Sequence, residues 1–144
     1  MESTIRWHAS EANDGGMSFI AETGSGHILA MDGAPEGGGR NLAPRPMELL
    51  LAGTGGCTAY DVVLILKRGR HAVTDCVVKL TSERAETDPK VFTKINMHFI
   101  VSGKNLKPDV VEKAIKLSAE KYCSASLMLG KTALISHSFE LAAG

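Results

Sequence analysis

The sequence lacks several features that mark common classes of protein. It has 16 basic and 16 acidic residues, so its formal net charge is zero and gives no electrostatic argument for binding nucleic acid or an anionic membrane. The longest strictly aliphatic run is the VVLIL of residues 62–66, far shorter than the roughly 20 residues of a membrane span. The N-terminal segment has no apolar stretch typical of a secretory signal. We therefore expect a cytoplasmic protein with neither nucleic acid nor membrane as a partner.

Cysteine is also scarce. The three cysteines, Cys57, Cys76 and Cys123, are too few and too far apart for the disulfide framework of a secreted domain. In a cytoplasmic protein, a cysteine pair is more often redox-active than structural. No C-x-x-C motif occurs, and no histidine has metal-ligand spacing to a cysteine or another histidine. We therefore expect no metal site and no cofactor. The histidines are His8, His27, His71, His98 and His137.

The first half of the chain predicts a small sheet, a loop and a long helix. The first 31 residues form short alternating segments separated by turns, which predict three antiparallel strands. Residues 32–45 are rich in glycine and proline and predict a loop. Pro46 suits the first position of a helix, and Gly69 suits its C-cap, so we expect a helix from Pro46 to Arg68. Because this helix is apolar nearly all round, we expect it to be buried on most sides.

The second half predicts a hairpin, another helix and a final strand. Residues 71–86 and 90–103 alternate and predict a long hairpin that turns at residues 87–90. Pro108 begins a second helix that should run to Gly130, and residues 133–142 predict the last strand. The order indicates one α+β domain over residues 1–144, with antiparallel sheets around two long helices. One small subunit could hardly cover the first helix, so we expect a homodimer.

Three glycines precede Cys57 in the first helix, although each costs about 1 kcal/mol relative to alanine in a helix interior. In one interpretation, the glycines allow close packing and Cys57 is a small buried hydrophobic residue. In the other, they give a substrate or a second thiol access to Cys57. Cys123 favours the second interpretation, because it is predicted on the inner face of the other long helix. The glycines are Gly53, Gly55 and Gly56.

The apolar residues of the second helix predict which of its faces points inward. These are Val111, Ile115, Ala119, Tyr122 and Cys123. Cys76, by contrast, shares a strand face with Val78 and Leu80, so we interpret it as a core cysteine without a redox role.

The segment PMELLLAGTGGCTAYDV, residues 46–62, resembles the OsmC/Ohr family of osmotically inducible and organic-hydroperoxide-resistance proteins. That family has a Pro-x-Glu-Leu-Leu segment, a run of small residues and a helical cysteine. A second cysteine late in the second helix, here in YCSAS, also matches. The longer GGGRNLAPRPMELLLAGTGGCT is most similar to the OsmC-like branch. The resemblance covers nearly the whole chain and implies an intertwined α+β homodimer with two sites at the subunit interface.

The resemblance also implies a chemistry, the reduction of organic hydroperoxides. Cys57 matches the peroxidatic cysteine, which attacks the peroxide as a thiolate and becomes a sulfenic acid. Cys123 matches the resolving cysteine, which converts the sulfenic acid into a disulfide that a dithiol reductant then reduces. General thiol chemistry agrees, since a thiolate is the nucleophile and a neighbouring thiol captures a sulfenic acid.

The activating residues of the family match less directly. In its peroxidases, a glutamate follows the proline and pairs with an arginine over the thiolate. Met47 holds that place here, and Glu48 is the next residue along the helix. We take Glu48 as the candidate carboxylate. Arg40 and Arg45 are the candidate arginines, and Arg40 is the better one because three glycines precede it.

Asp61 is a second departure, because a carboxylate one helical turn after Cys57 would disfavour its thiolate. The candidate catalytic residues are therefore Cys57, Cys123, Arg40 and Glu48, with an organic hydroperoxide and a dithiol reductant as partners. The departures leave an alternative open. The protein could be a redox-sensitive or ligand-binding OsmC-like dimer without significant peroxidase activity.

Overall fold

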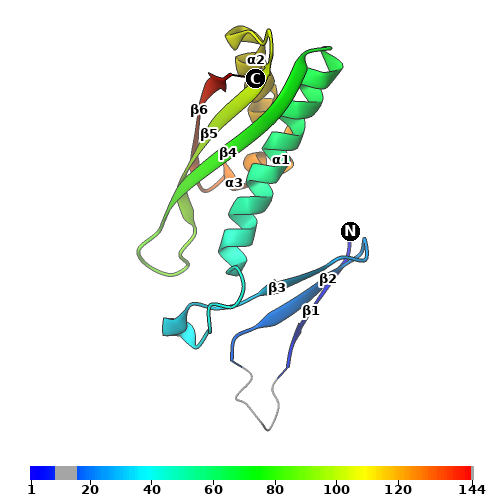
Figure 1. The fold of residues 1–144 in the computed structure, drawn as a ribbon. Coiled ribbons are helices and arrows are strands. Elements are labelled where there is room, and N and C mark those ends of the chain that lie inside the picture. Colours follow the sequence, from blue (N-terminus) through cyan, green and yellow to red (C-terminus); the bar gives the residue numbers. More distant parts are fainter. Residues whose placement is uncertain (9–15, 144) are drawn as a thin grey trace. The chain divides into compact units, whose positions relative to one another are not determined.

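The computed structural model describes residues 1–8 and 16–143. The contacts of the chain fall into two compact units, Met1–Leu50 and Leu51–Gly144. The elements are two three-stranded sheets and a set of helices, so the expected α+β class is confirmed (Figure 1). The assignment of residues 1–144 to a single domain stays a prediction.

The first unit contains the three expected antiparallel strands. They are β1 (Ser3–Trp7), β2 (Phe19–Thr23) and β3 (Ile28–Met31), hydrogen-bonded in the order β1-β2-β3. A short 3₁₀ turn, η1 (Pro35–Gly37), interrupts the loop that follows. The alternation of the sequence therefore predicted this sheet correctly.

The loop after β3 is organised around one buried carboxylate. Asp32 is only 1% exposed and accepts hydrogen bonds from the backbone N–H groups of Gly33 (2.7 Å), Arg40 (3.2 Å) and Leu42 (3.0 Å). These hydrogen bonds, chiefly that from Leu42, hold the pKa of Asp32 below its ordinary value of 3.8. Gly39 lies so close to the Gly33 backbone that a side chain at position 39 would overlap it. The glycines therefore permit a closely packed loop.

The long helix α1 (Pro46–Arg68) has the bounds that the sequence predicted. It ends in a backbone motif in which Arg70 adopts the left-handed conformation (φ 60°) and the His71 N–H donates to the Leu66 carbonyl (3.0 Å). Its buried residues recur at helical spacing and form a single stripe. They are Thr54, Gly55, Thr58, Val62 and Leu66. Within one chain, therefore, α1 buries one side only.

Among the described residues, α1 is the one helix that is long and apolar enough to cross a membrane, with a mean hydropathy of 1.7 over 18 residues. The core helix of a soluble protein meets the same criteria of length and composition, so this property is weak support for a span. Only 28% of this 18-residue stretch of α1 is buried within the chain. The expectation of a protein without membrane contact stays a prediction.

The second unit is built on a mixed sheet. Strands β4 (Ala72–Arg84) and β5 (Phe92–Lys104) form the expected antiparallel hairpin. The last strand, β6 (Leu134–Ala142), pairs with β5 in parallel, so the expectation of purely antiparallel sheets was wrong. The helical segment between β5 and β6 carries the chain back to the other end of the sheet, which is the crossover that parallel pairing requires.

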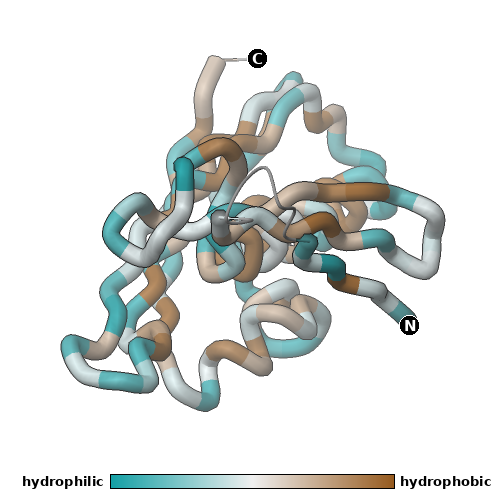
Figure 2. The backbone as a smooth tube through the Cα atoms, turned by 90° about the horizontal axis from the view of Figure 1, so that it is seen from below, coloured by the Kyte–Doolittle hydropathy of each residue, from teal (hydrophilic) through white to brown (hydrophobic). Residues whose placement is uncertain are grey.

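The two faces of this sheet differ in polarity. Alternate side chains of β5 are fully buried, among them Met97 and Phe99, and α1 lies alongside the sheet on this face (Figure 1). On the other face, neighbouring strands are joined by exposed polar pairs such as Asn96 with Ser136. Hydrophobic and hydrophilic residues are interspersed along much of the chain (Figure 2). The core therefore lies between one sheet face and the helices.

The expected second long helix is broken, and this is the main correction to the predicted secondary structure. It consists of α2 (Pro108–Leu117), a π-helical turn η2 (Ser118–Tyr122) and a short helix α3 (Ser124–Leu129). Cys123 lies between η2 and α3 with extended backbone angles (φ −73°, ψ 95°), so it does not lie on a helix face. Tyr122 was expected on the inner face but is 50% exposed.

Candidate functional site

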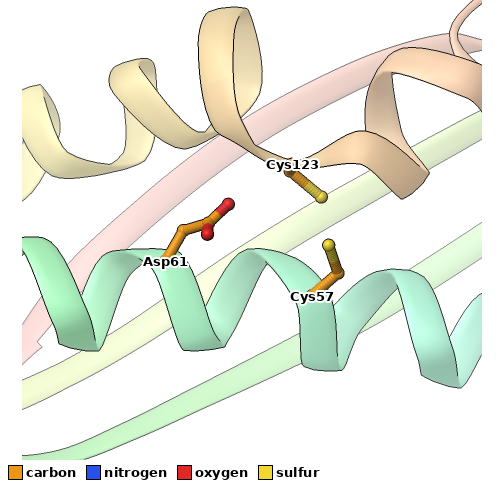
Figure 3. A group of neighbouring side chains, drawn as sticks. All are labelled: Cys57, Asp61 and Cys123. Atoms are coloured by element: carbon orange, nitrogen blue, oxygen red, sulfur yellow. The ribbon is translucent and has the colours of Figure 1, made fainter.

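Three side chains of the second unit point toward one another. Cys57 and Asp61 are one turn apart on α1 and therefore share a face of the helix. Cys123 approaches them from the break between η2 and α3 (Figure 3). The two sulfur atoms and a carboxylate oxygen all lie within 4.8 Å of one another. We call this group the Cys57–Asp61–Cys123 cluster.

Cys123 is held by the first turn of α3. Its side chain is fully buried, and its sulfur accepts hydrogen bonds from the Ser126 backbone N–H (3.4 Å) and the Ser126 hydroxyl (3.0 Å). The sulfur therefore acts as the N-cap of α3 and orients the thiol toward α1. Burial raises the pKa of Cys123 above its ordinary value of 9.0, the Ser126 hydrogen bonds oppose this change, and the nearby Cys57 adds to it.

Asp61 is held by a pair of hydroxyl groups. The Ser118 hydroxyl donates to Asp61 Oδ2 (2.9 Å) and is itself hydrogen-bonded to the Thr58 hydroxyl (2.9 Å). Thr58 and Ser118 are fully buried, so these contacts join α1 to η2 inside the second unit. The π-helical turn supports them, because the Cys123 N–H donates to the Ser118 carbonyl (2.8 Å). The break in the helix therefore positions both Ser118 and Cys123.

This arrangement permits thiol–disulfide chemistry. Cys57 and Cys123 are both free, and Cys57 is half-buried where Cys123 is fully buried. The two sulfur atoms lie within 4.8 Å of one another, and a disulfide would require them to approach to about 2.05 Å. The expected juxtaposition of the two thiols is therefore present, and the division of catalytic roles between them stays a prediction.

Cys76 lies outside the cluster, as expected. It is half-buried on β4, on the same face as Val78 and Leu80. Burial, with a smaller contribution from the charge of Asp75, raises the pKa of its thiol. This is the environment of an unreactive core cysteine.

The other two candidate residues belong to the first unit. The Glu48 carboxylate accepts a hydrogen bond from the Arg45 backbone N–H (2.9 Å) and lies 3.6 Å from the Arg45 guanidinium. Arg40 follows the glycine run, and its N–H donates to Asp32. The assignment of Arg40 and Glu48 to the activation of Cys57 stays a prediction.

Sequence reasoning treated Asp61 only as an unfavourable charge, although its spacing of four residues from Cys57 was a signal that both share a helix face. Ser126 lies three residues after Cys123, which is the spacing of an N-cap contact, but cysteine is not among the usual N-cap residues and the contact was not predicted. Ser118 and Thr58 carry no such signal. Their contact depends on the packing of η2 against α1.

Comparison with known proteins agrees with this geometry. The profile of the OsmC-like protein family matches residues 37–138, a segment that includes both Cys57 and Cys123. The chain is also 49% identical over 143 residues to the protein YhfA of Escherichia coli K12, with 99% of each chain covered. This chain belongs to the OsmC family. The name YhfA gives no activity.

Solved structures of similar proteins have the same fold. A structure from structural genomics, 48% identical and covering 100% of both chains, superposes with a TM-score of 0.87. A hypothetical protein from Aquifex aeolicus VF5 is 29% identical, covers 100% of this chain and 98% of its own, and has a TM-score of 0.80. An organic hydroperoxide resistance protein OsmC from Legionella pneumophila is 17% identical, covers 97% of each chain, and has a TM-score of 0.67. At that identity the likeness concerns the fold alone.

Proposed function

We propose that this protein is a thiol-dependent peroxidase that reduces organic hydroperoxides, with Cys57 as the peroxidatic and Cys123 as the resolving cysteine. The observation that carries the proposal is the position of two free thiols from separate elements within 4.8 Å of one another. Membership of the OsmC family, which the family profile matching residues 37–138 shows, supports a role of the same kind.

The proposed cycle has three balanced steps. The Cys57 thiolate attacks the outer peroxide oxygen, the O–O bond breaks, and the alkoxide takes a proton to leave as an alcohol. Cys57 is then a sulfenic acid. The Cys123 sulfur attacks the Cys57 sulfur and releases water, which leaves a disulfide. An external dithiol reduces the disulfide by thiol–disulfide exchange, restores both thiols and becomes a disulfide itself.

The environments of the two thiols favour this division of roles. Cys57 is half-buried, so it is the more accessible of the two cysteines to a peroxide from solvent. Cys123 is fully buried and its pKa is raised by that burial, so it is the poorer nucleophile toward a peroxide from solvent. It needs to react only with the adjacent Cys57 sulfenic acid. A buried thiol that meets one neighbouring sulfur suits the resolving role.

The proposal also includes activation by Arg40 and Glu48. A guanidinium near the Cys57 sulfur would favour the thiolate and orient the peroxide, and a carboxylate would hold that guanidinium. Because Met47 stands where the peroxidases of the family have the carboxylate, we expect slower chemistry than is typical of them. Met47→Glu should then speed the reaction.

We further propose that the enzyme is a cytoplasmic homodimer that uses a dithiol reductant. The surface of α1 supports self-association, because Tyr60 is 69% exposed and apolar residues line the groove beside it. An organic tail on the substrate would suit an apolar interface. The proposal includes no nucleic acid, membrane or cofactor.

The test is peroxide consumption with a dithiol reductant, comparing an organic hydroperoxide with hydrogen peroxide. Cys57→Ser should abolish turnover, because a hydroxyl group is not ionised near neutral pH. Cys123→Ser should retain one stoichiometric reaction and then accumulate Cys57 as sulfenic or sulfinic acid. Cys76→Ser is the matched control and should turn over like the parent.

One result would favour the alternative function. If Cys57→Ser consumes peroxide as fast as the parent protein, the enzyme proposal fails. The protein is then better explained as a redox-sensitive or ligand-binding dimer. Met47 in place of the family's carboxylate, and Asp61 one turn after Cys57, would agree with a weakly activated thiol.

A further inference from the structure

The Cys57–Asp61–Cys123 cluster contains two sulfur atoms and a carboxylate, which together make a metal-ligand set. We propose that the reduced protein binds one thiophilic divalent cation of the Zn²⁺ class through Cys57, Asp61 and Cys123. This inference goes beyond the peroxidase proposal, since it concerns binding and needs no peroxide.

The geometry is close to what such an ion requires. Zinc binds sulfur at about 2.3 Å and carboxylate oxygen at about 2.0–2.2 Å, so two sulfur ligands of a tetrahedral ion lie roughly 3.8 Å apart. The three candidate ligand atoms lie within 4.8 Å of one another. Side-chain rotations that shift an atom by about 1 Å would bring them to these separations. Three protein ligands leave a fourth position, as zinc sites with an exchangeable ligand do.

The charge of the cluster also favours a cation. The side chains that hydrogen-bond Asp61 and Cys123, Ser118 and Ser126, are neutral. A divalent cation bound here would displace the thiol protons, and the two thiolates and the Asp61 carboxylate would then balance its charge.

Two serines orient the ligands before an ion arrives. The Ser118 hydroxyl fixes one oxygen of Asp61, and Ser126 fixes the Cys123 sulfur through two hydrogen bonds. Such outer contacts orient metal ligands, and their loss typically lowers metal affinity 10–100-fold. The cluster is therefore built from supported ligands, with Cys57 and Asp61 on one helical face.

The experiment uses the reduced full-length protein in the absence of peroxide. Zn²⁺ affinity is measured by competition with a chromophoric chelator, and Co²⁺ serves as a spectroscopic probe of thiolate ligation. We expect one ion per chain, thiolate-to-Co²⁺ charge-transfer absorption, and protection of Cys57 and Cys123 from alkylation by bound Zn²⁺. Failure of this protection in the unmodified protein would overturn the proposal without reference to any variant.

The variants assign the ligands. Cys57→Ser, Cys123→Ser and Asp61→Asn should each weaken Zn²⁺ binding more than Ser118→Ala, for which about a 10-fold loss is expected. Cys76→Ser removes a thiol outside the cluster and should bind like the parent, with circular dichroism checking the fold of each variant. If Cys76→Ser loses binding, or if Cys57→Ser keeps it, the proposal is wrong.

The two proposals can fail separately. A protein that reduces hydroperoxides but binds no Zn²⁺ refutes the metal site alone. A protein that binds Zn²⁺ through the cluster but does not reduce hydroperoxides refutes the peroxidase alone.

Discussion

At the scale of single residues, the two thiols of the cluster differ because different neighbours surround them. Cys57 follows exposed Gly56 on α1 and is half-buried, whereas Cys123 is fully buried beneath the first turn of α3. Ser126 partly offsets the effect of that burial by donating two hydrogen bonds to the Cys123 sulfur. A serine therefore adjusts how readily the proposed resolving thiol ionises.

The first prediction concerns this serine. In Ser126→Ala the hydroxyl donor to Cys123 is lost, so the pKa of Cys123 should rise further above 9.0. A smaller thiolate fraction of Cys123 slows its attack on the Cys57 sulfur, so the Cys57 sulfenic acid should persist longer in single-turnover trapping. Ser124→Ala, at an exposed position of the same helix, is the control. An unchanged lifetime in Ser126→Ala would contradict the prediction.

The sequence predicted which thiols meet, but not how they meet. Both were expected to face inward from two packed helices, and the family resemblance paired Cys57 with Cys123. Sequence reasoning missed the helix break at Cys123, because cysteine is not among the usual N-cap residues. The hydroxyl contact between Thr58 and Ser118 was also beyond reach, since it depends on how η2 packs on α1.

At the scale of elements, predictability depended on how local the signal was. The bounds of α1 followed from Pro46 at its first position and the glycine at its end. The direction of β6 did not follow, because strand alternation is the same for parallel and antiparallel pairing. Only the length of the helical connection between β5 and β6 indicated a crossover.

The second prediction compares two neighbouring glycines of α1. A Cβ atom added at Gly55 would lie 2.6 Å from Leu80 Cδ1, whereas one at Gly56 would meet nothing within 4 Å in the same chain. Gly55→Leu should therefore destabilise the protein by about 1–3 kcal/mol in thermal unfolding, because it overpacks the contact with β4. Gly56→Leu should gain close to 1 kcal/mol of helix propensity unless a partner packs there. A Gly55→Leu variant as stable as the parent would contradict this assignment of space.

The third prediction concerns the loop after β3. Since the pKa of Asp32 is lowered in the folded protein, its stabilising effect is present above 3.8 and is lost as the pH falls below that value. Asp32→Asn should remove the charge that the backbone N–H groups of Arg40 and Leu42 contact. Amide hydrogen exchange at these two residues should therefore be faster in the variant at pH values well above 4. Glu36→Gln, an exposed change in the same loop, should leave exchange unaltered.

At the scale of the whole molecule, α1 presents more apolar surface than one chain covers. A groove of about 410 Å³ runs along it and is lined mainly by small and apolar side chains. Its lining residues are Gly56, Ala59, Tyr60, Val63, Leu64 and Lys67. Contiguous apolar surface of this kind is typical of a protein–protein interface. The sequence predicted the apolar helix, and the structure locates its uncovered side.

The last prediction is that the protein is a homodimer that uses this side of α1. Sedimentation equilibrium should give twice the mass of one chain, and a folded monomer at micromolar concentration would refute the dimer. Tyr60→Glu places a charge on the apolar groove and should shift the equilibrium toward monomer, because an unpaired charge is costly to bury. Lys113→Glu, on the exposed face of α2, has no such effect if the interface lies on α1.

Gly56→Leu separates the two explanations of the glycines. A weaker dimer would indicate that Gly56 provides clearance for the partner chain, whereas a more stable dimer with unchanged thiol reactivity would show that it does not.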